Sequence, residues 1–160
     1  MKVLDTDTLT LLFAGHRRVI EHHQQETEEV AITVVSQIET LQGRFAMLLK
    51  AADGAQLRRA QQWLDQTLRN LAAIPKVVPI EDAAADEFDR LRENKKLRRI
   101  GRADLLIACI VLANRATLVT RNRKHFRQVP GLRVESWADR SPRRPGITVE
   151  KRRRWKQPGR

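Results

Sequence analysis

Three carboxylates lie far apart in this sequence but occupy comparable places in its pattern. Asp5 follows a short apolar segment, residues 3–4, which favours a strand. Glu39 follows the β-branched run at residues 30–35, and Asp104 opens a continuous apolar segment. In open parallel sheets the ligand edge lies where strands end and helices begin, so these three acids are predicted to converge in one cleft.

The side chains predicted for this cleft favour a hard divalent cation. Carboxylate oxygens, without a cysteine pair or a histidine pair at metal-ligand spacing, favour Mg²⁺ or Mn²⁺ over zinc. Clustered carboxylates without a cation would repel one another and raise each other's pKa. Such a site supports phosphodiester hydrolysis, in which one or two metal ions polarise the phosphate and lower the pKa of a bound water.

Polar and basic residues crowd around the same predicted edge. Thr120 ends an apolar strand at residues 116–120, where its hydroxyl could orient a water molecule. A basic connection precedes Asp104, and a second basic cluster follows Thr120. Lysine and arginine bind the nucleic-acid backbone through its phosphates. The predicted backbone-binding residues are Arg99, Arg102, Arg121, Arg123 and Lys124.

The elements that must position these residues alternate between strands and helices. Such alternation predicts an α/β fold, with a parallel sheet covered by helices on both sides. Predicted strands cover residues 3–4, 30–35, 77–80, 116–120 and 132–137, and the most apolar helix covers 105–113. Residues 40–50 and 57–71 predict an additional helical hairpin, broken at residues 53–54.

Several local features are also predicted. Thr6, Asp7 and Thr8 offer capping groups for the first helix, and Ser36 followed by Glu39 matches a capping box. Asn114 is predicted to adopt a left-handed conformation just past its helix. The apolar stripe of the second hairpin helix is read as core or as a partner contact; it comprises Leu57, Ala60, Leu64, Leu68 and Leu71, with Trp63 beside it.

Composition sets the domain organisation. The 160 residues fit one domain, predicted to cover residues 1–137, and the net charge of +12 favours a polyanionic partner. Nine basic residues against Glu150 give residues 140–160 a charge of +8, so 138–160 are predicted to form a flexible basic tail. Cys109 is alone, which excludes an internal disulfide and favours an inert core position. No signal peptide or membrane anchor is recognisable, so a cytoplasmic location is expected.

Five segments in order and spacing resemble the PIN-domain ribonucleases, especially the VapC-like toxins of type II toxin–antitoxin systems. They are VLDTDTLTLL, SQIETLQGR, RADLLIACIVL, LVTRNRKHF and VPGLRVESW, and the resemblance covers residues 2–137. It implies a three-layer α/β/α fold, Mg²⁺- or Mn²⁺-dependent RNA cleavage, homodimerisation and inhibition by a small cognate antitoxin. By position, Asp5, Glu39 and Asp104 match the family's acidic residues as metal ligands or water activators, Glu39 directly or through water. The fourth acidic position falls on Asn122.

Three alternatives stay open at this level. Many relatives carry aspartate where this chain has Asn122, and aspartate often stands at the position of His125, so a PIN-like module that binds RNA without turnover is one alternative. The segment DTDTL superficially resembles the nucleophile motif of haloacid-dehalogenase-like phosphatases, but its fifth position is Leu9 and no downstream GDxxxD motif follows. Asp104 also has an ordinary structural explanation as a helix N-cap.

Overall fold

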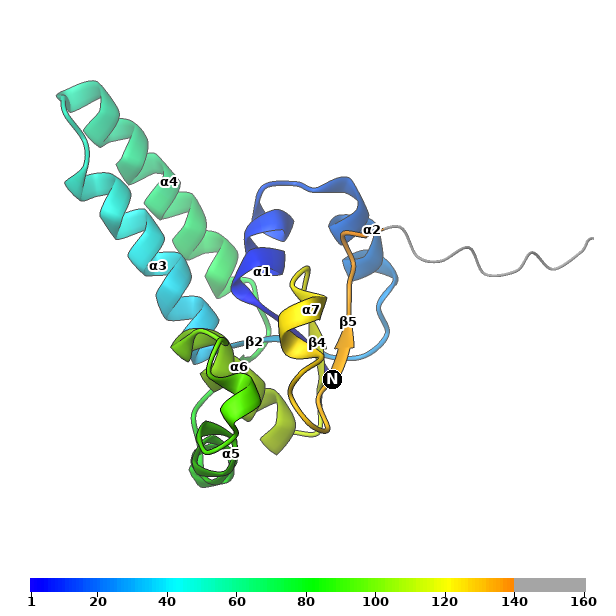
Figure 1. Ribbon diagram of the computed structural model, residues 1–160. Helices are drawn as coiled ribbons and strands as arrows, with labels where there is room; N and C mark the ends of the chain where they lie inside the picture. Colours follow the sequence, from blue (N-terminus) through cyan, green and yellow to red (C-terminus); the bar gives the residue numbers. More distant parts are fainter. Residues whose placement is uncertain (140–160) are drawn as a thin grey trace, which may run out of the picture.

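A parallel five-stranded sheet forms the centre of the fold (Figure 1). The structure is a computed structural model that describes residues 1–139. Every neighbouring pair is parallel, and the strand order is β3-β2-β1-β4-β5. The strands are β1 (Lys2–Leu4), β2 (Val30–Thr33), β3 (Val77–Val78), β4 (Thr117–Val119) and β5 (Arg133–Glu135). The predicted α/β class with a central parallel sheet is confirmed.

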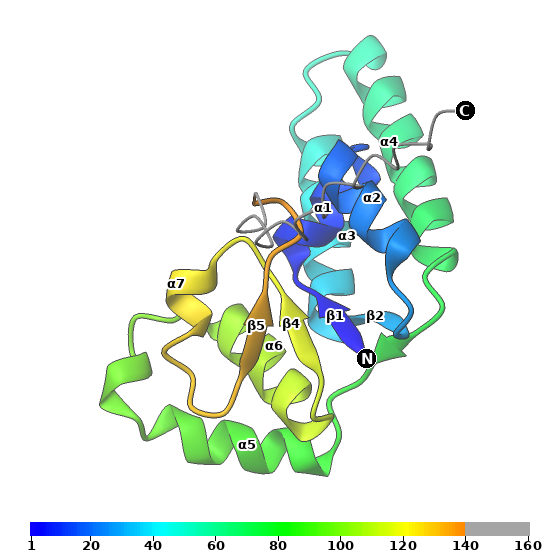
Figure 2. The same cartoon turned by 90° about the vertical axis from the view of Figure 1, so that its right-hand side faces the viewer.

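Helices cover both faces of this sheet. They are α1 (Thr6–Phe13), α2 (Arg17–Gln25), α3 (Val34–Leu49), α4 (Gly54–Ala72), α5 (Asp82–Arg92), the short 3-10 helix η1 (Lys95–Leu97), α6 (Arg102–Ala113) and α7 (Arg123–Phe126). Helices α5 and α6 lie on one side of the sheet, and α1 and α2 on the other (Figures 1 and 2). The predicted hairpin is formed by α3 and α4, which project together away from the sheet.

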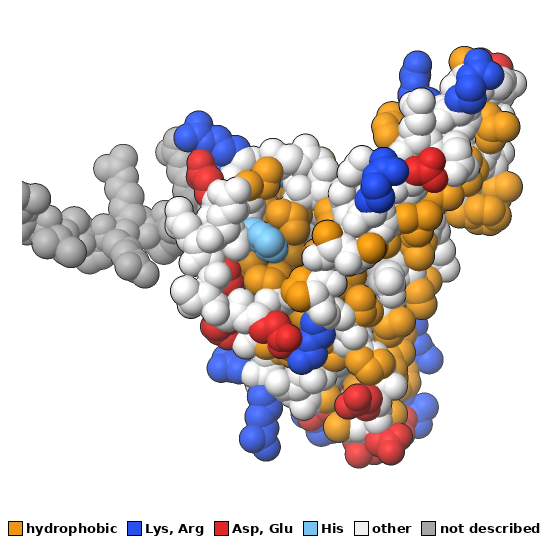
Figure 3. All heavy atoms as spheres, turned by 180° about the vertical axis from the view of Figure 1, so that it is seen from behind, with side chains coloured by type: hydrophobic (Ala, Val, Ile, Leu, Met, Phe, Trp, Pro, Cys, Tyr) orange, Lys and Arg blue, Asp and Glu red, His pale blue; other side chains and the backbone are white. Residues whose placement is uncertain are grey.

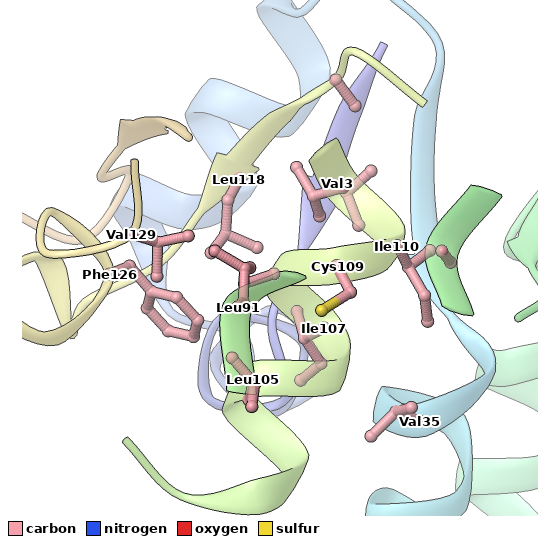
Figure 4. Close-up of a cluster of buried hydrophobic side chains, with 14 of the residues drawn as sticks. Val3, Val35, Leu91, Leu105, Ile107, Cys109, Ile110, Leu118, Phe126 and Val129 are labelled. Carbon is pink, nitrogen blue, oxygen red and sulfur yellow. The ribbon is translucent and has the colours of Figure 1, made fainter. Parts of the chain in front are cut away.

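The protein has two hydrophobic cores, one on each face of the sheet, because successive side chains of the central strands point to opposite faces. Val3 and Leu118 face the core built around α6, which Figure 4 shows in close-up. Their neighbours Leu4 and Val119 face the second core, together with Leu9 of α1. Because successive side chains of a strand point to opposite faces, both faces of the central strands are buried.

Helix α6 is buried nearly all round, as its continuous apolar sequence predicts. Residues 107–111 are all buried, and the helix packs between the sheet and α5. Cys109 is among these residues, and burial raises the pKa of its thiol to about 11. The predicted core position of Cys109 is therefore confirmed, and a thiol that stays protonated at neutral pH is a poor nucleophile.

The junction between β2 and α3 differs from the prediction. The strand ends at Thr33, and Val34 and Val35 begin the helix. The N-cap is Thr33, whose hydroxyl accepts a hydrogen bond of 3.0 Å from the backbone N–H of Ser36. The predicted capping box beginning at Ser36 is therefore wrong. β-Branched residues favour strands, but a threonine cap and burial of Val35 against α6 override that preference.

The first helix also begins earlier than predicted. Asp5 is its N-cap, and the Asp5 carboxylate accepts a hydrogen bond of 2.8 Å from the backbone N–H of Thr8. The predicted caps Thr6, Asp7 and Thr8 are instead residues of the first helical turn. Strand β1 ends at Leu4 and helix α1 begins at Thr6, so Asp5 both follows the strand and caps the helix.

Two further predictions need correction. Arg115, with φ of 50°, takes the left-handed conformation after α6, whereas Asn114 has φ of −89°. The Asn114 amide donates to the carbonyl of Ile110 at 2.9 Å and so closes the helix end by its side chain. Strand β3 contains only Val77 and Val78, shorter than the predicted 77–80.

Trp137 marks the last buried position of the described chain. Its side chain is 3% exposed, and its indole N–H donates to Glu135 at 2.9 Å. Its ring stacks on His22 of α2 with 6.1 Å between centroids. From residue 140 on, the predicted basic tail lies outside the described residues. Within residues 1–139, every helix is too short or too polar to cross a lipid bilayer.

Candidate active site

Asp5, Glu39 and Asp104 come from three elements and lie within electrostatic reach of one another. Asp5 directly follows β1, Glu39 is in the second turn of α3, and Asp104 is in the first turn of α6. The charges of Asp5 and Glu39 both act on Asp104, where they disfavour its ionised form. The structure thus places these acids of distant sequence position at one end of the sheet.

Asp5 is the most enclosed of the three. It is 5% exposed, and its backbone N–H donates to the carbonyl of Val119 at 3.1 Å, which ties it to β4. Burial raises the pKa of the Asp5 carboxyl, while hydrogen bonds from Thr120 and Thr8 lower it and the charge of Asp7 raises it. Burial dominates, because charged groups lose hydration there.

Glu39 is held by the first residue of α1. The hydroxyl of Thr6 donates to the Glu39 carboxylate at 2.5 Å, which joins α3 to α1 across the candidate site. Thr6 therefore positions an acid of the cluster by a direct contact. The sequence indicated a supporting role for Thr6 but could not identify the residue that it supports.

Asp104 is not the N-cap of helix α6. The N-cap of α6 is Gly101, and Asp104 is the third residue of the helix, so the N-cap alternative is wrong. Burial first, and then the charges of Asp5 and Glu39, raise the pKa of the half-buried Asp104 carboxyl, while His125 lowers it. In the described part of the chain, the carboxylate of Asp104 accepts no hydrogen bond from another residue.

The acids carry negative charge without basic partners. Across residues 1–139, Asp5, Asp7, Glu39 and Asp104 form no ion pair with lysine or arginine. Within the same residues, no three His, Cys, Asp or Glu side chains are grouped at metal-ligand spacing. The donor set fits a hard divalent cation by its chemistry, because it is all oxygen and its charge is uncompensated.

Thr120 and Asn122 connect the end of β4 to this cluster. Thr120 is fully buried, and its hydroxyl accepts a hydrogen bond of 2.8 Å from the backbone N–H of Asn122. The Asn122 side-chain nitrogen lies 2.8 Å from Nδ1 of His125, one turn further along α7. The sequence did not predict α7 or this contact; the spacing of three residues between the two polar side chains was the available signal.

The predicted phosphate-binding residues occupy different environments. Arg121 and Lys124 are exposed at the end of β4 and the start of α7. Arg123 is partly buried, and its Nε has no hydrogen-bond partner among residues 1–139. Arg99 is exposed in the connection before α6. Arg102 lies with its guanidinium 4.5 Å from the ring centroid of Phe88, so it packs on α5.

An apolar groove lies apart from the acids, between α1, α2 and α4. It encloses about 650 Å³, and Figure 3 shows a hollow where hydrophobic side chains surround a histidine. Leu12 and Phe13 line it from α1, His23 from α2, and Asn70 from α4. Sequence reasoning did not find this groove, because its wall combines residues from separate helices.

The projecting hairpin exposes further apolar surface. Phe45 is 59% exposed and Leu49 is 72% exposed, on α3. Within the predicted stripe of α4, Ala60 and Leu71 are buried while Leu57 remains 50% exposed. The stripe therefore divides between core and surface.

Comparison with known proteins gives one similar curated sequence and several similar structures. Ribonuclease VapC2 of Rickettsia felis is 53% identical over 38 residues, a stretch that spans 24% of this chain and 28% of that protein. The structure of VapBC2 from Rickettsia felis bound to a promoter DNA fragment matches with a TM-score of 0.68 and 23% identity, over 85% of this chain and 98% of that chain. DNA-bound VapBC from Salmonella typhimurium matches with a TM-score of 0.67 and 22% identity, over 85% and 97%.

At these identities the structural likeness shows the fold, and the family follows from the sequence match. The family model described as the PIN domain matches residues 2–132, which include the three acids and Asn122. Most of the segments that resemble VapC-like proteins lie inside this match. The chain therefore belongs to the PIN domain family.

Proposed function

We propose that this protein is a divalent-metal-dependent ribonuclease that acts as the toxin of a toxin–antitoxin pair. The observation that carries the proposal is the convergence of Asp5, Glu39 and Asp104 without a basic partner in the described chain of a PIN-domain protein. The name of the similar Ribonuclease VapC2 supports RNA as the substrate. Such an enzyme would act in the cytoplasm, where RNA is abundant.

In this proposal Asp5 and Asp104 hold Mg²⁺ or Mn²⁺, and Glu39 contributes directly or through a water molecule. The bound ion supplies polarisation of the phosphate and a lower pKa for the attacking water. Thr6 holds the Glu39 carboxylate in place. Thr120 fixes the backbone of Asn122 and hydrogen-bonds Asp5, so it couples two residues of the site.

Basic residues around the acids bind the RNA backbone in this proposal. Arg121, Arg123 and Lys124 follow β4 in the segment that also carries His125, whose charge acts on Asp104, and there they would offset the charge of the approaching phosphates. Arg121 and Lys124 are exposed and so accessible to RNA, whereas Arg123 is partly buried and its Nε lacks a hydrogen-bond partner in the described chain. Arg99 and Arg102 would contact more distant phosphates.

A cleavage assay tests the proposal. Purified protein, free of antitoxin, should cleave a labelled RNA in the presence of Mn²⁺ or Mg²⁺ and lose that activity in EDTA. Absence of cleavage with either ion on both structured and single-stranded RNA, combined with unchanged RNA binding by Asp104→Asn, would favour the module that binds RNA without turnover. The observation behind that second candidate is Asn122, which removes one negative charge from the family's acidic set.

Replacing Asn122 by aspartate is expected to tighten Mn²⁺ binding. The added carboxylate increases the negative charge near the site, and an added charge of opposite sign contributes about tenfold in affinity. Isothermal titration calorimetry measures the change. Asn114→Asp, the same substitution at the far end of α6, should leave Mn²⁺ affinity unchanged. Equal or weaker Mn²⁺ affinity for Asn122→Asp would contradict a place for Asn122 in the site.

The apolar groove is proposed as the binding site of a small antitoxin. The similar structures include toxin–antitoxin complexes, which supports a protein partner for this chain. The groove is lined by apolar side chains together with polar ones such as His23 and Asn70, as suits an amphipathic peptide segment. The exposed apolar face of the α3–α4 hairpin is proposed as the contact with a second copy, which sedimentation analysis would detect.

Leu12→Glu is expected to impair inhibition by the antitoxin. A charge placed in the groove wall should weaken binding about a hundredfold, the size of a lost interface hot spot. The measurement is inhibition of RNA cleavage by the cognate antitoxin, to be sought as the product of a small reading frame directly upstream. Ile80→Glu adds the same charge at an exposed apolar position outside the groove and should be inhibited normally. Equal inhibition of both variants would exclude the groove as the binding site.

A further inference from the structure

The start of α7 carries a side-chain pair whose geometry defines a hydrogen-bond donor. Asn122 is fixed twice: its backbone N–H donates to Thr120 at 2.8 Å, and its side-chain nitrogen lies 2.8 Å from Nδ1 of His125. Thr120 is itself fully buried. The imidazole is therefore anchored through Asn122 to the rigid end of β4.

This contact favours one tautomer of His125. An amide nitrogen only donates hydrogen bonds, so Nδ1 of His125 must accept. In a neutral imidazole whose Nδ1 accepts, the proton is on Nε2. The His125 side chain is exposed, so its Nε2–H is available to a ligand.

The surroundings of this donor favour an anionic ligand beside the acid cluster. His125 lies within electrostatic reach of Asp104. Two residues before His125, Arg123 adds a partly buried guanidinium whose Nε has no hydrogen-bond partner within residues 1–139. Arg121 and Lys124 add exposed positive charge to the same short segment. An RNA phosphate can accept hydrogen bonds from these donors while the next phosphate of the same strand is bound at the acids.

We infer that His125 binds a phosphate of the RNA through Nε2–H and that Asn122 is the positioning residue that presents it. The inference rests on the proposed ribonuclease function. It adds His125 to the site as a residue that binds phosphate beside the acid cluster. It also gives a physical reason for asparagine at position 122. An aspartate there would accept from Nδ1–H, so the neutral ring would present a lone pair at Nε2 and only the imidazolium could donate to phosphate, whereas asparagine lets the neutral ring donate.

The tautomer is tested by NMR on the ¹⁵N-histidine-labelled full chain. Long-range ¹H–¹⁵N correlation spectra, recorded above the usual imidazole pKa, distinguish the two neutral forms. The expected result is the Nε2–H form for His125 in the natural sequence and the Nδ1–H form in Asn122→Asp. Observation of the Nδ1–H form in the natural sequence would overturn the inference.

Binding of RNA tests the role of the donor. In an Asp104→Asn background that prevents cleavage, fluorescence anisotropy measures affinity for a short, fluorescein-labelled single-stranded RNA of mixed sequence. His125→Phe should weaken binding about tenfold, the effect of losing one hydrogen bond to a charged group. His125→Gln keeps a donor and should recover most of the affinity, and Gln128→Ala, exposed one turn later, should change nothing. Unchanged affinity in His125→Phe would overturn the inference.

A metal titration separates this inference from the proposed function. Mn²⁺ affinity, measured by calorimetry without RNA, should be the same for the natural sequence and His125→Phe, and a large loss would place His125 at the metal and overturn its phosphate role. If RNA is never cleaved but His125→Phe still weakens RNA binding, the ribonuclease proposal fails and this inference holds. If RNA is cleaved equally well by both proteins, this inference fails and the ribonuclease proposal holds.

Discussion

Asp104→Asn should lower RNA cleavage about a thousandfold, because several kcal/mol of metal-dependent transition-state stabilisation would be lost. The same substitution should raise thermal stability. Burial and the charges of Asp5 and Glu39 disfavour the ionised Asp104 carboxyl, and a neutral amide removes that repulsion at little change in volume. Loss of activity with a gain in melting temperature distinguishes a functional acid from a structural one.

The pH dependence of this stability difference follows from the direction of the pKa shift. The pKa of Asp104 is raised above 3.8 in the folded protein, so the folded state binds its proton more tightly than the unfolded state. The stability that this proton provides is complete below the unfolded pKa and is lost as pH rises through the folded pKa. The advantage of Asp104→Asn should therefore be small in acid and should grow as pH rises toward neutrality.

Melting curves measured with and without Mn²⁺ complete this test. Mn²⁺ should stabilise the natural sequence more than Asp104→Asn, since a bound ion stabilises only the folded state that holds it. Asp86→Asn, an exposed acid of α5, is the matched control and should change neither cleavage nor the response to Mn²⁺. Normal cleavage, or a lowered melting temperature, in Asp104→Asn would refute the assigned role.

Trp137→Ala should destabilise the fold by about 3–5 kcal/mol, the usual cost of truncating a buried aromatic side chain. Trp137 is 3% exposed and joins the second core, where it stacks on His22 of α2. The family model ends at residue 132, but this burial supports the proposal that the domain extends to residue 137. Chemical denaturation measures the change in the free energy of unfolding. Trp155→Ala, in the part of the chain beyond the described residues, should leave that free energy unchanged.

Removal of residues 140–160 should separate folding from RNA binding. If the domain ends at residue 137, the shortened chain should keep its melting temperature. Loss of nine basic residues should weaken RNA affinity and reduce its dependence on salt, because fewer counterions would be released on binding. A markedly lower melting temperature would show instead that this segment contributes to the folded domain.

The sequence predicted the features that depend on strong local patterns. Alternating apolar and polar segments identified the parallel sheet and its covering helices, and the continuous apolar run identified α6. Asp5, Glu39 and Asp104 were recognised because each stood at the end or start of such a segment. Their mutual electrostatic reach depended on the order of strands in space, which no local pattern contains.

Where the strand prediction failed, a local helix cap together with a tertiary contact outweighed the strand preference of β-branched residues. Val34 and Val35 favour a strand, yet the Thr33 cap places them in α3 and moves Glu39 into the second turn, within reach of Thr6. Helix α7 is too short to show any periodicity, so the contact between Asn122 and His125 emerged only from the structure.

Asp5 caps the N-terminus of helix α1 and also belongs to the acid cluster. These two roles affect which substitutions are tolerated at this position during evolution. A descendant that had lost its nuclease activity would still be selected to retain aspartate at this position, because replacing an N-cap costs about 1 kcal/mol of stability. Asp104 is not an N-cap, so its replacement carries no such capping cost. Among relatives of this protein, the residue at position 104 should therefore report on surviving activity far better than the residue at position 5.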